Sequence, residues 1–290
     1  MPSRQLLLSH ASILALLAVA NAVAGDAALA SDFGPTERQA ALPAVSGLNA
    51  KVGGFGAALS GDAAGGVFLG LALPLGHDFG AQIDGLAGTV EGGDAFHGLG
   101  GHLFWRDPSR ALVGIYASHV QWETDSAGSG SGRSDLGKVG FESQLYLGRL
   151  SLEGLAAYQF GSDDGFAGKG AVAYYPRDDL RLHVAVTHYA GPGFAASTGL
   201  EWAPHSGRGM SLFADVGVDE SHDVRALVGL KFYAARNDKS LIARHREDDP
   251  DVDLPNDLFH TSQTGQGRPS QSQQCPPGEV LIDGFCDGST

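Results

Sequence analysis

The stretch LGKVGFESQLYLGRLSLEGLAAYQF, residues 136–160, contains the pattern that decides the fold of this chain. Apolar and polar side chains alternate along it, so that Val139 and Phe141 share one face while Glu142 lies on the other. Such alternation is typical of a β-strand, because successive side chains of a strand point to opposite faces. A Gly-Arg dipeptide forms a short turn at the centre. The stretch therefore predicts two neighbouring strands joined by a tight connection.

The same pattern is repeated along residues 48–233, where twelve segments of 9 to 13 residues are separated by turn residues. This length matches the roughly 9–11 residues that a tilted strand needs to cross a bilayer, whereas strands of soluble sheets usually have about five or six. The predicted strands are 48–60, 65–73, 79–90, 95–105, 111–122, 136–147, 150–160, 165–175, 180–190, 194–202, 210–218 and 222–233.

The connections between these segments fall into two classes. LGHD, RDPS and YPRDD are short turns, whereas ETDSAGSGSGRSD, residues 123–135, is long and belongs to the opposite end. An even number of strands with short turns at one end and longer loops at the other is typical of a bacterial membrane barrel. A soluble β-sandwich with its polar groups facing water would give the same alternation and remains the alternative.

Aromatic residues gather near the ends of the segments, as expected where strands meet the two membrane interfaces. The last segment ends in Lys231-Phe232-Tyr233, and an aromatic-terminated final strand resembles the assembly signal of outer-membrane barrels. The aromatic residues assigned to the two rims are Trp105, Trp122, Tyr174, Tyr175, Tyr189, Trp202, Phe232 and Tyr233.

Residues 48–233 as a whole resemble a Gram-negative outer-membrane β-barrel of the porin-like class, in an uncharacterised subfamily. The resemblance implies an all-β fold, an antiparallel transmembrane β-barrel of about 12 strands, within a range of roughly 10–14. It also implies contact with outer-membrane lipid, insertion by the barrel assembly machinery, both termini in the periplasm and a water-exposed interior.

The N-terminal end predicts export. Residues 1–24 match a secretory signal peptide, because Arg4 precedes an apolar stretch and an Ala-Val-Ala tripeptide supplies the small residues of a cleavage site. A membrane-anchor helix is the alternative, although polar residues interrupt the apolar run. Residues 25–47 are assigned to a periplasmic N-terminal segment.

The C-terminal end has a different composition. Residues 234–274 are dense in charge and then polar and of low complexity, which predicts a disordered linker. In the tail, residues 275–290, Cys275 and Cys286 are expected to close a small disulfide loop in an oxidising compartment. Two thiols are too few ligands for a metal site, so the loop is interpreted as structural, or as the contact point for a periplasmic partner.

The polar face of the segments places charged side chains in the barrel interior. Five basic and five acidic residues balance one another, which argues against the single-sign ring that strong ion selectivity requires. A barrel of about 12 strands is wider than side chains readily fill, so either water solvates these charges or they pair across the lumen and leave a closed interior. The predicted lumen-lining charges are Lys51, Asp84, Glu142, Glu153, Lys169, Arg181, Glu201, Asp215, Arg225 and Lys231.

Charge and motifs limit the functional classes. A net charge of −14 argues against a nucleic-acid partner. No HExxH, GxSxG or Walker loop is present, and the pair His205-Ser206 lacks a neighbouring asparagine, so no catalytic residue, metal or cofactor is predicted. We expect a passive, porin-like diffusion channel and not an enzyme. The alternatives are a non-conducting structural or interaction barrel whose periplasmic tail tethers a partner or the cell wall, and an outer-membrane hydrolase.

Overall fold

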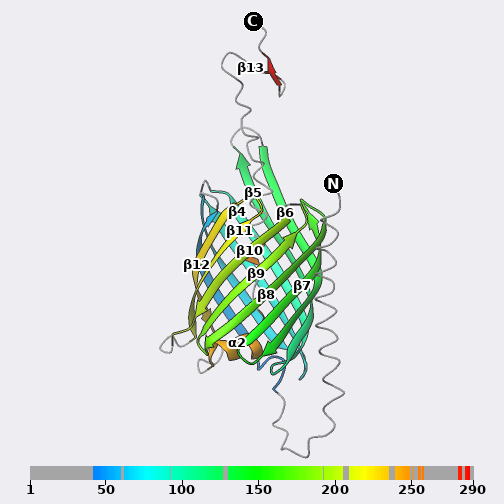
Figure 1. Ribbon diagram of the computed structural model, residues 1–290, viewed down its shortest axis with the longest axis vertical. Coiled ribbons are helices and arrows are strands. Elements are labelled where there is room, and N and C mark those ends of the chain that lie inside the picture. Colours follow the sequence, from blue (N-terminus) through cyan, green and yellow to red (C-terminus); the bar gives the residue numbers. More distant parts are fainter. Residues whose placement is uncertain are drawn as a thin grey trace, which may run out of the picture.

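The chain folds into a closed β-barrel, seen from the side in Figure 1. The computed structural model describes residues 42–59, 62–91, 93–126, 130–191, 193–204, 209–234, 239–248, 250, 254, 255, 257, 280–282 and 285–287. Each barrel strand pairs antiparallel with its sequence neighbours, and β1 pairs with β12 to close the ring. The expected twelve-stranded antiparallel barrel is confirmed. Its strands are β1 (Asn49–Leu59), β2 (Asp62–Pro74), β3 (Phe79–Val90), β4 (Ala95–Asp107), β5 (Ala111–Ser126), β6 (Gly130–Leu147), β7 (Leu150–Gly161), β8 (Gly165–Arg177), β9 (Leu180–Tyr189), β10 (Gly193–Trp202), β11 (Met210–Asp219) and β12 (Val224–Tyr233).

The hairpin of β5 and β6 extends beyond the other strands at one end of the barrel (Figure 1). The sequence predicts a long loop over residues 123–135, but the ladder continues to the pair of Ser126 with Gly130. Backbone hydrogen bonds require no particular side chain, so a stretch rich in glycine and serine can lengthen a hairpin. We call this end the long-hairpin end. The opposite, short-turn end holds the connections 75–78, 108–110, 148–149 and 178–179.

Large apolar side chains cover the outside of the barrel. Leu99, Phe141 and Val228 are 68%, 67% and 62% exposed, whereas Leu227, next to Val228, is buried inside. Soluble monomers rarely expose contiguous apolar surface on this scale, but a strand that crosses lipid does. The barrel is also one closed sheet, which excludes the soluble sandwich of two stacked sheets.

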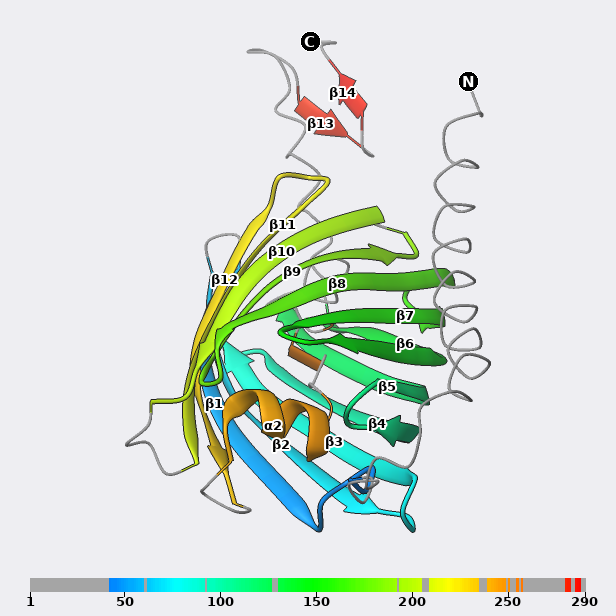
Figure 2. The same cartoon turned by 60° about the horizontal axis from the view of Figure 1, so that its bottom comes forward.

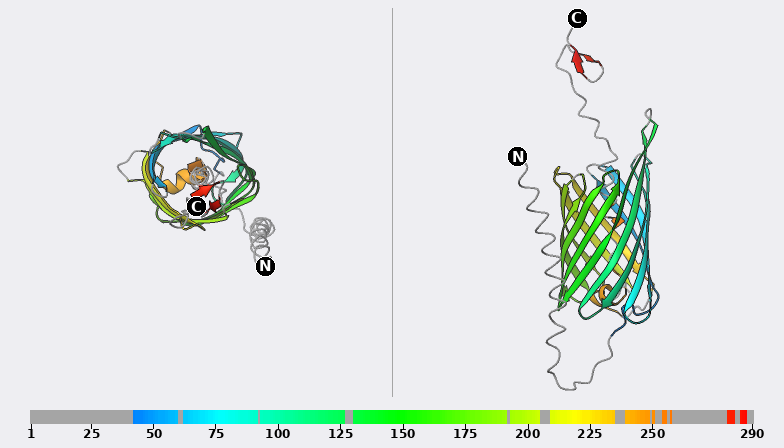
Figure 3. Two further views of the ribbon diagram at one scale, coloured as in Figure 1. Left: turned by 90° about the horizontal axis from the view of Figure 1, so that it is seen from above. Right: turned by 90° about the vertical axis from the view of Figure 1, so that its right-hand side faces the viewer.

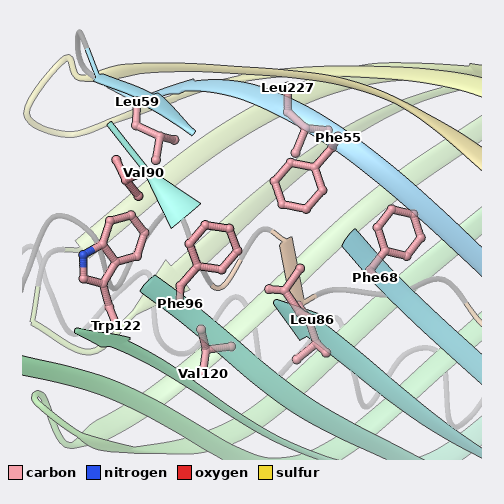
Figure 4. Packing of buried hydrophobic residues seen from close by; sticks show 10 residues of the cluster. Phe55, Leu59, Phe68, Leu86, Val90, Phe96, Val120, Trp122 and Leu227 are labelled. Atoms are coloured by element: carbon pink, nitrogen blue, oxygen red, sulfur yellow. The ribbon is translucent and has the colours of Figure 1, made fainter. Parts of the chain in front are cut away.

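Apolar side chains also fill part of the lumen (Figure 4). The rings of Phe96 and Trp122 stack with their centroids 5.6 Å apart. Glycine makes room for them, because a Cβ added at Gly88 would lie 2.3 Å from Cζ of Phe96. This part of the interior is packed, which corrects the expectation of a water-exposed interior. The buried residues of this lumenal apolar cluster are Phe55, Leu59, Phe68, Leu86, Val90, Phe96, Val120, Trp122, Leu227 and Leu254.

A short helix, α2 (Leu241–Glu247), lies inside the ring of strands at the short-turn end (Figures 2 and 3). Ser240 caps it by accepting a hydrogen bond from the Ala243 amide, a role that serine fills well. The sequence predicts a disordered linker over residues 234–274, and the structure corrects this prediction for residues 239–248, 250, 254, 255 and 257, which we call the plug segment. Side chains of the barrel wall pair with the charges of this segment. The composition of the segment alone does not reveal this pairing.

Three expectations fall mainly on residues outside the described part of the chain. These are the signal peptide, most of the N-terminal segment, and the disulfide, because Cys275 is not described. Near the C-terminus, β13 (Val280–Ile282) and β14 (Phe285–Asp287) pair as a small antiparallel hairpin. Among the described residues, no helix has the length and apolar character needed to cross a membrane.

Candidate functional site: the plugged lumen

α2 is held against the barrel wall at the short-turn end. The Ile242 amide donates to the carbonyl of Asp178, in the turn between β8 and β9, at 3.2 Å. Leu241 is fully buried, and the guanidinium of Arg244 lies 4.9 Å from the centroid of the Tyr233 ring. A cation over an aromatic face contributes about 0.5–2 kcal/mol. These contacts fix α2 across the short-turn mouth of the lumen.

Arg246 of α2 connects the helix to the opposite wall. Its guanidinium lies 4.9 Å from the ring centroid of Tyr146 on β6, and its Nη2 donates to the carbonyl of Leu150 at 3.0 Å. The backbone carbonyl of Arg246 accepts from Nη1 of Arg106 on β4 at 3.1 Å. Burial lowers the pKa of Arg246, but an arginine keeps its charge at neutral pH. One residue, through its side chain and its backbone carbonyl, therefore ties the helix to three strands.

A buried carboxylate, Glu201 on β10, accepts hydrogen bonds from two strands and lies close to α2. It accepts hydrogen bonds from Lys231 Nζ at 2.7 Å, Tyr233 Oη at 2.6 Å and Ser211 Oγ at 2.5 Å. The imidazole Nε2 of His245 on α2 lies 3.5 Å from the same carboxylate. Hydrogen bonds to an ionised group are the stronger ones in proteins, so this cluster stabilises the wall beside the helix.

The segments that precede β1 and follow β12 meet at the short-turn mouth. Ser46 Oγ donates to Oδ1 of Asp248 at 2.6 Å, and Lys239 Nζ lies 2.5 Å from the same oxygen. Val45 is buried beside Phe104 inside the barrel. The end of the predicted periplasmic N-terminal segment therefore enters the lumen and helps to close it.

Beyond α2 the plug segment runs along the lumen. The carbonyl of Pro250 accepts from Lys51 Nζ at 2.6 Å and from Gln82 Nε2 at 3.3 Å. Leu254 belongs to the lumenal apolar cluster, and its Cδ2 lies 3.5 Å from the position that a Cβ on Gly100 would take. The wall thus binds the segment first through polar groups and then through apolar ones.

The last described residue of the plug segment, Asp257, is held by an ion pair with Lys138 on β6. Each of these two side chains is 3% exposed, and Ser118 Oγ donates to Oδ2 of Asp257 at 3.3 Å. The ammonium of Lys138 lies 4.5 Å from the centroid of Tyr189, the last residue of β9 at the long-hairpin end. The plug segment therefore extends from one mouth of the lumen to the other.

The structure places all ten predicted lumen charges on the inner face of the barrel, and most of them pair with other residues of the wall. Lys51, Glu201 and Lys231 belong to the plug contacts described above, while Lys169 and Arg225 line a cavity. The remaining pairs are His102 with Asp84 and with Glu142, each at 2.9 Å, Arg181 with Glu153 at 2.9 Å, and His183 with Asp215 at 2.8 Å.

Two cavities in the lumen have volumes of about 80 and 30 Å³. The larger is lined by polar side chains that include Arg181, His183 and Asp215. Since one water molecule takes about 30 Å³ in the liquid, these cavities have room for a few waters. They do not form a channel of the width that a diffusing solute needs.

The structure corrects half of the predicted aromatic rim. Strand alternation sends adjacent side chains to opposite faces, so Tyr174 and Tyr175 cannot both face lipid. Tyr175 points inward and shares a hydrogen bond of 2.9 Å with Nδ1 of His245. Facing outward are Trp105, Tyr174, Trp202 and Phe232, whereas Trp122, Tyr175, Tyr189 and Tyr233 are buried in the lumen.

The sequence pattern alone does not predict the plug segment or the pairing of the lumenal histidines with acidic residues. His102 lies two residues before buried Phe104 on the same strand, so the period-two pattern already placed it inside. The pair His205-Ser206 is outside the described residues. Within the part of the chain that the structure describes, no cluster of histidine, cysteine or acidic residues could hold a metal ion.

The chain resembles several solved structures at low sequence identity. No protein-family model and no curated protein matches the sequence. The KdgM porin in complex with disordered oligogalacturonate is 10% identical with a TM-score of 0.49, over 63% of this chain and 98% of that one. Outer membrane phospholipase A from Escherichia coli is 13% identical with a TM-score of 0.43, over 66% and 94%. The translocator domain of autotransporter NalP from Neisseria meningitidis is 13% identical with a TM-score of 0.44, over 77% and 97%. The closed antiparallel barrel is established by the strand pairing of the chain itself, and likeness at this level adds no conclusion about its role.

Proposed function

We propose that the protein is an outer-membrane barrel whose lumen is closed by its own C-terminal segment, and that the folded protein is a non-conducting structural or interaction barrel. The ion pair of Lys138 with Asp257 carries this proposal, because it seats the far end of the plug segment in a dry site near the long-hairpin end. The apolar outer face supports membrane insertion, with the short turns on the periplasmic side, as in bacterial barrels.

Closure follows from contacts at successive levels of the lumen. Ions need a continuous, wide and hydrated path through a pore. The path meets α2 at the short-turn mouth, the Pro250 carbonyl bound by Lys51 above it, and Asp257 bound by Lys138 near the other mouth. A channel would need the whole segment to leave its partners.

Conductance in planar bilayers tests the proposal. We expect no current steps from the full chain, and steps from a variant that ends at residue 238 and lacks the plug segment. A variant that ends at residue 257 is the matched control, because it keeps every plug contact described above and should stay silent. The shorter variant's folded state is checked by its heat-dependent mobility on gels. Steps of equal size from the full chain and from the variant ending at residue 238 would overturn the proposal.

A diffusion channel that opens when the plug segment leaves is the second candidate. It is favoured by the charge pairs of the wall that do not involve the plug segment, such as Arg181 with Glu153 and His183 with Asp215. These would line the opened pore with balanced charge. Weakly selective currents from the variant ending at residue 238, together with openings of the full chain under any applied voltage, would favour this candidate.

A further inference from the structure

We infer that the chain crosses the barrel, so that the residues after Asp257 leave at the long-hairpin end, opposite to the end where α2 lies. The inference goes beyond closure of the lumen, which a segment that folded back on itself would also achieve. It replaces the expectation that both termini lie on the same side of the membrane. The barrel would then display the C-terminal part of its own chain on the far side.

The entry point of the plug segment is fixed at the short-turn end. Ile242 is bonded to Asp178 in the β8–β9 turn, and Arg246 is bonded to Leu150, the first residue of β7 after the β6–β7 turn. Figure 2 shows α2 in this mouth, within the ring of strands. The chain has therefore only begun to cross at Glu247.

The far contact is fixed at the other end. Lys138 pairs in register with Gln159, two residues before β7 ends at Gly161 on the long-hairpin side. Gln159 Nε2 in turn donates at 3.1 Å to the carbonyl of Ala190, in the β9–β10 connection of that same end. Asp257, bound to Lys138, thus lies close to the mouth from which the β5–β6 hairpin extends.

The described residues near the far contact stay inside the lumen. Leu254 belongs to the lumenal apolar cluster, and residues 254, 255 and 257 are helical.

The two cavities found in the described part of the lumen have volumes of about 80 and 30 Å³, and each is too small for a second pass of chain beside the first. The residues that follow Asp257 include the polar stretch TSQTGQGRPSQSQQ and then the β13–β14 hairpin. Such a polar composition favours water over a packed interior.

Tag accessibility on intact cells tests the inference. One protein carries an epitope tag with a protease site after Thr290, a second carries it in the β6–β7 turn at Gly148, and a third in the β7–β8 turn at Asp163. The two turns lie at opposite ends of the barrel. Each tag is probed with added protease and antibody before and after the outer membrane is permeabilised.

We expect the tag after Thr290 to behave like the tag at Asp163 and unlike the tag at Gly148. The comparison is made with the barrel's own turns, so it holds for either orientation in the membrane and does not depend on conductance. A Thr290 tag that behaves like the Gly148 tag would overturn the inference while leaving the closed lumen of the proposed function intact. In a Lys138→Gln protein the barrel should stay folded. A smaller fraction of the Thr290 tags should then show the accessibility of the Asp163 tag. An unchanged fraction would contradict the role given to Asp257.

Discussion

Replacing Lys138 by methionine is expected to release the far end of the plug segment. In the wild type the ammonium of Lys138 and the carboxylate of Asp257 pair where each side chain is 3% exposed. Methionine retains an apolar stem against the Tyr189 ring but leaves the carboxylate buried without its counter-ion. Breaking a buried pair by removing one partner costs about 3–5 kcal/mol. The Lys138→Met protein avoids this cost when Asp257 leaves the lumen and water solvates its carboxylate.

Thiol labelling at position 118 measures this release. Ser118 is buried and hydrogen-bonded to Asp257, so in a Ser118→Cys protein that also carries Cys275→Ser and Cys286→Ser, a membrane-impermeant maleimide reacts when Asp257 has left. Each factor of ten in population corresponds to about 1.4 kcal/mol. The cost of about 3–5 kcal/mol for breaking the pair therefore predicts labelling that is faster by roughly 10²- to 4 × 10³-fold.

Two controls separate the ion pair from a general loss of charge. Arg181→Met also removes a lumenal cation, from the pair with Glu153 and not from the plug segment, and should leave the labelling rate unchanged. Lys138→Met combined with Asp257→Leu should return the rate close to that of the parent, because an apolar pair replaces a buried ion pair at little cost. A Lys138→Met protein that is labelled no faster than its parent would refute the reasoning.

Three further predictions use the same proteins. Leu254→Ala removes a buried side chain of the lumenal apolar cluster and should weaken plug docking by about 2–5 kcal/mol, measured by the labelling assay. Leu99→Ala on the outer face should leave docking unchanged. Equal effects of the two substitutions would contradict the packing of Leu254. Glu201→Gln removes a buried charge and should destabilise the barrel by about 3–5 kcal/mol, followed as thermal unfolding in detergent, and an unchanged melting temperature would mean that the cluster contributes little. Tyr175→Phe loses the hydrogen bond to α2 and should cost plug docking about 0.5–1.5 kcal/mol, while its outward neighbour Tyr174→Phe should match the parent; the reverse order would mean that the faces of β8 were misassigned.

The wall of the barrel could be predicted from the sequence because its side chains obey a period of two. That pattern separates Val139 and Phe141 from Glu142, and it repeats often enough to set the number of strands. The same rule, applied strictly, would also have placed Tyr175 and Tyr233 in the lumen. Their position at strand ends favours the rim, but the direction of a strand side chain alternates whatever its composition.

The plug segment could not be predicted in the same way. A segment buried against polar partners has the composition of an exposed one, so the run around Arg246 and Asp248 indicates solvent exposure when it is considered alone. Its burial depends on matching groups far away in the sequence, such as Lys51 and Lys138. A balanced set of lumenal charges was consistent with either water or a polypeptide as their partner.

The pairing of β1 with β12 has a consequence for how this molecule is assembled. Once the seam from Lys51 to Leu59 has formed, the ring has no open side, and folded chains seldom pass one segment through a closed loop. The plug segment must therefore enter the lumen before β1 pairs with β12, or thread into the lumen lengthwise after the barrel has closed. Once the barrel has closed, the plug segment can leave the lumen only along the barrel axis, through one of the two mouths.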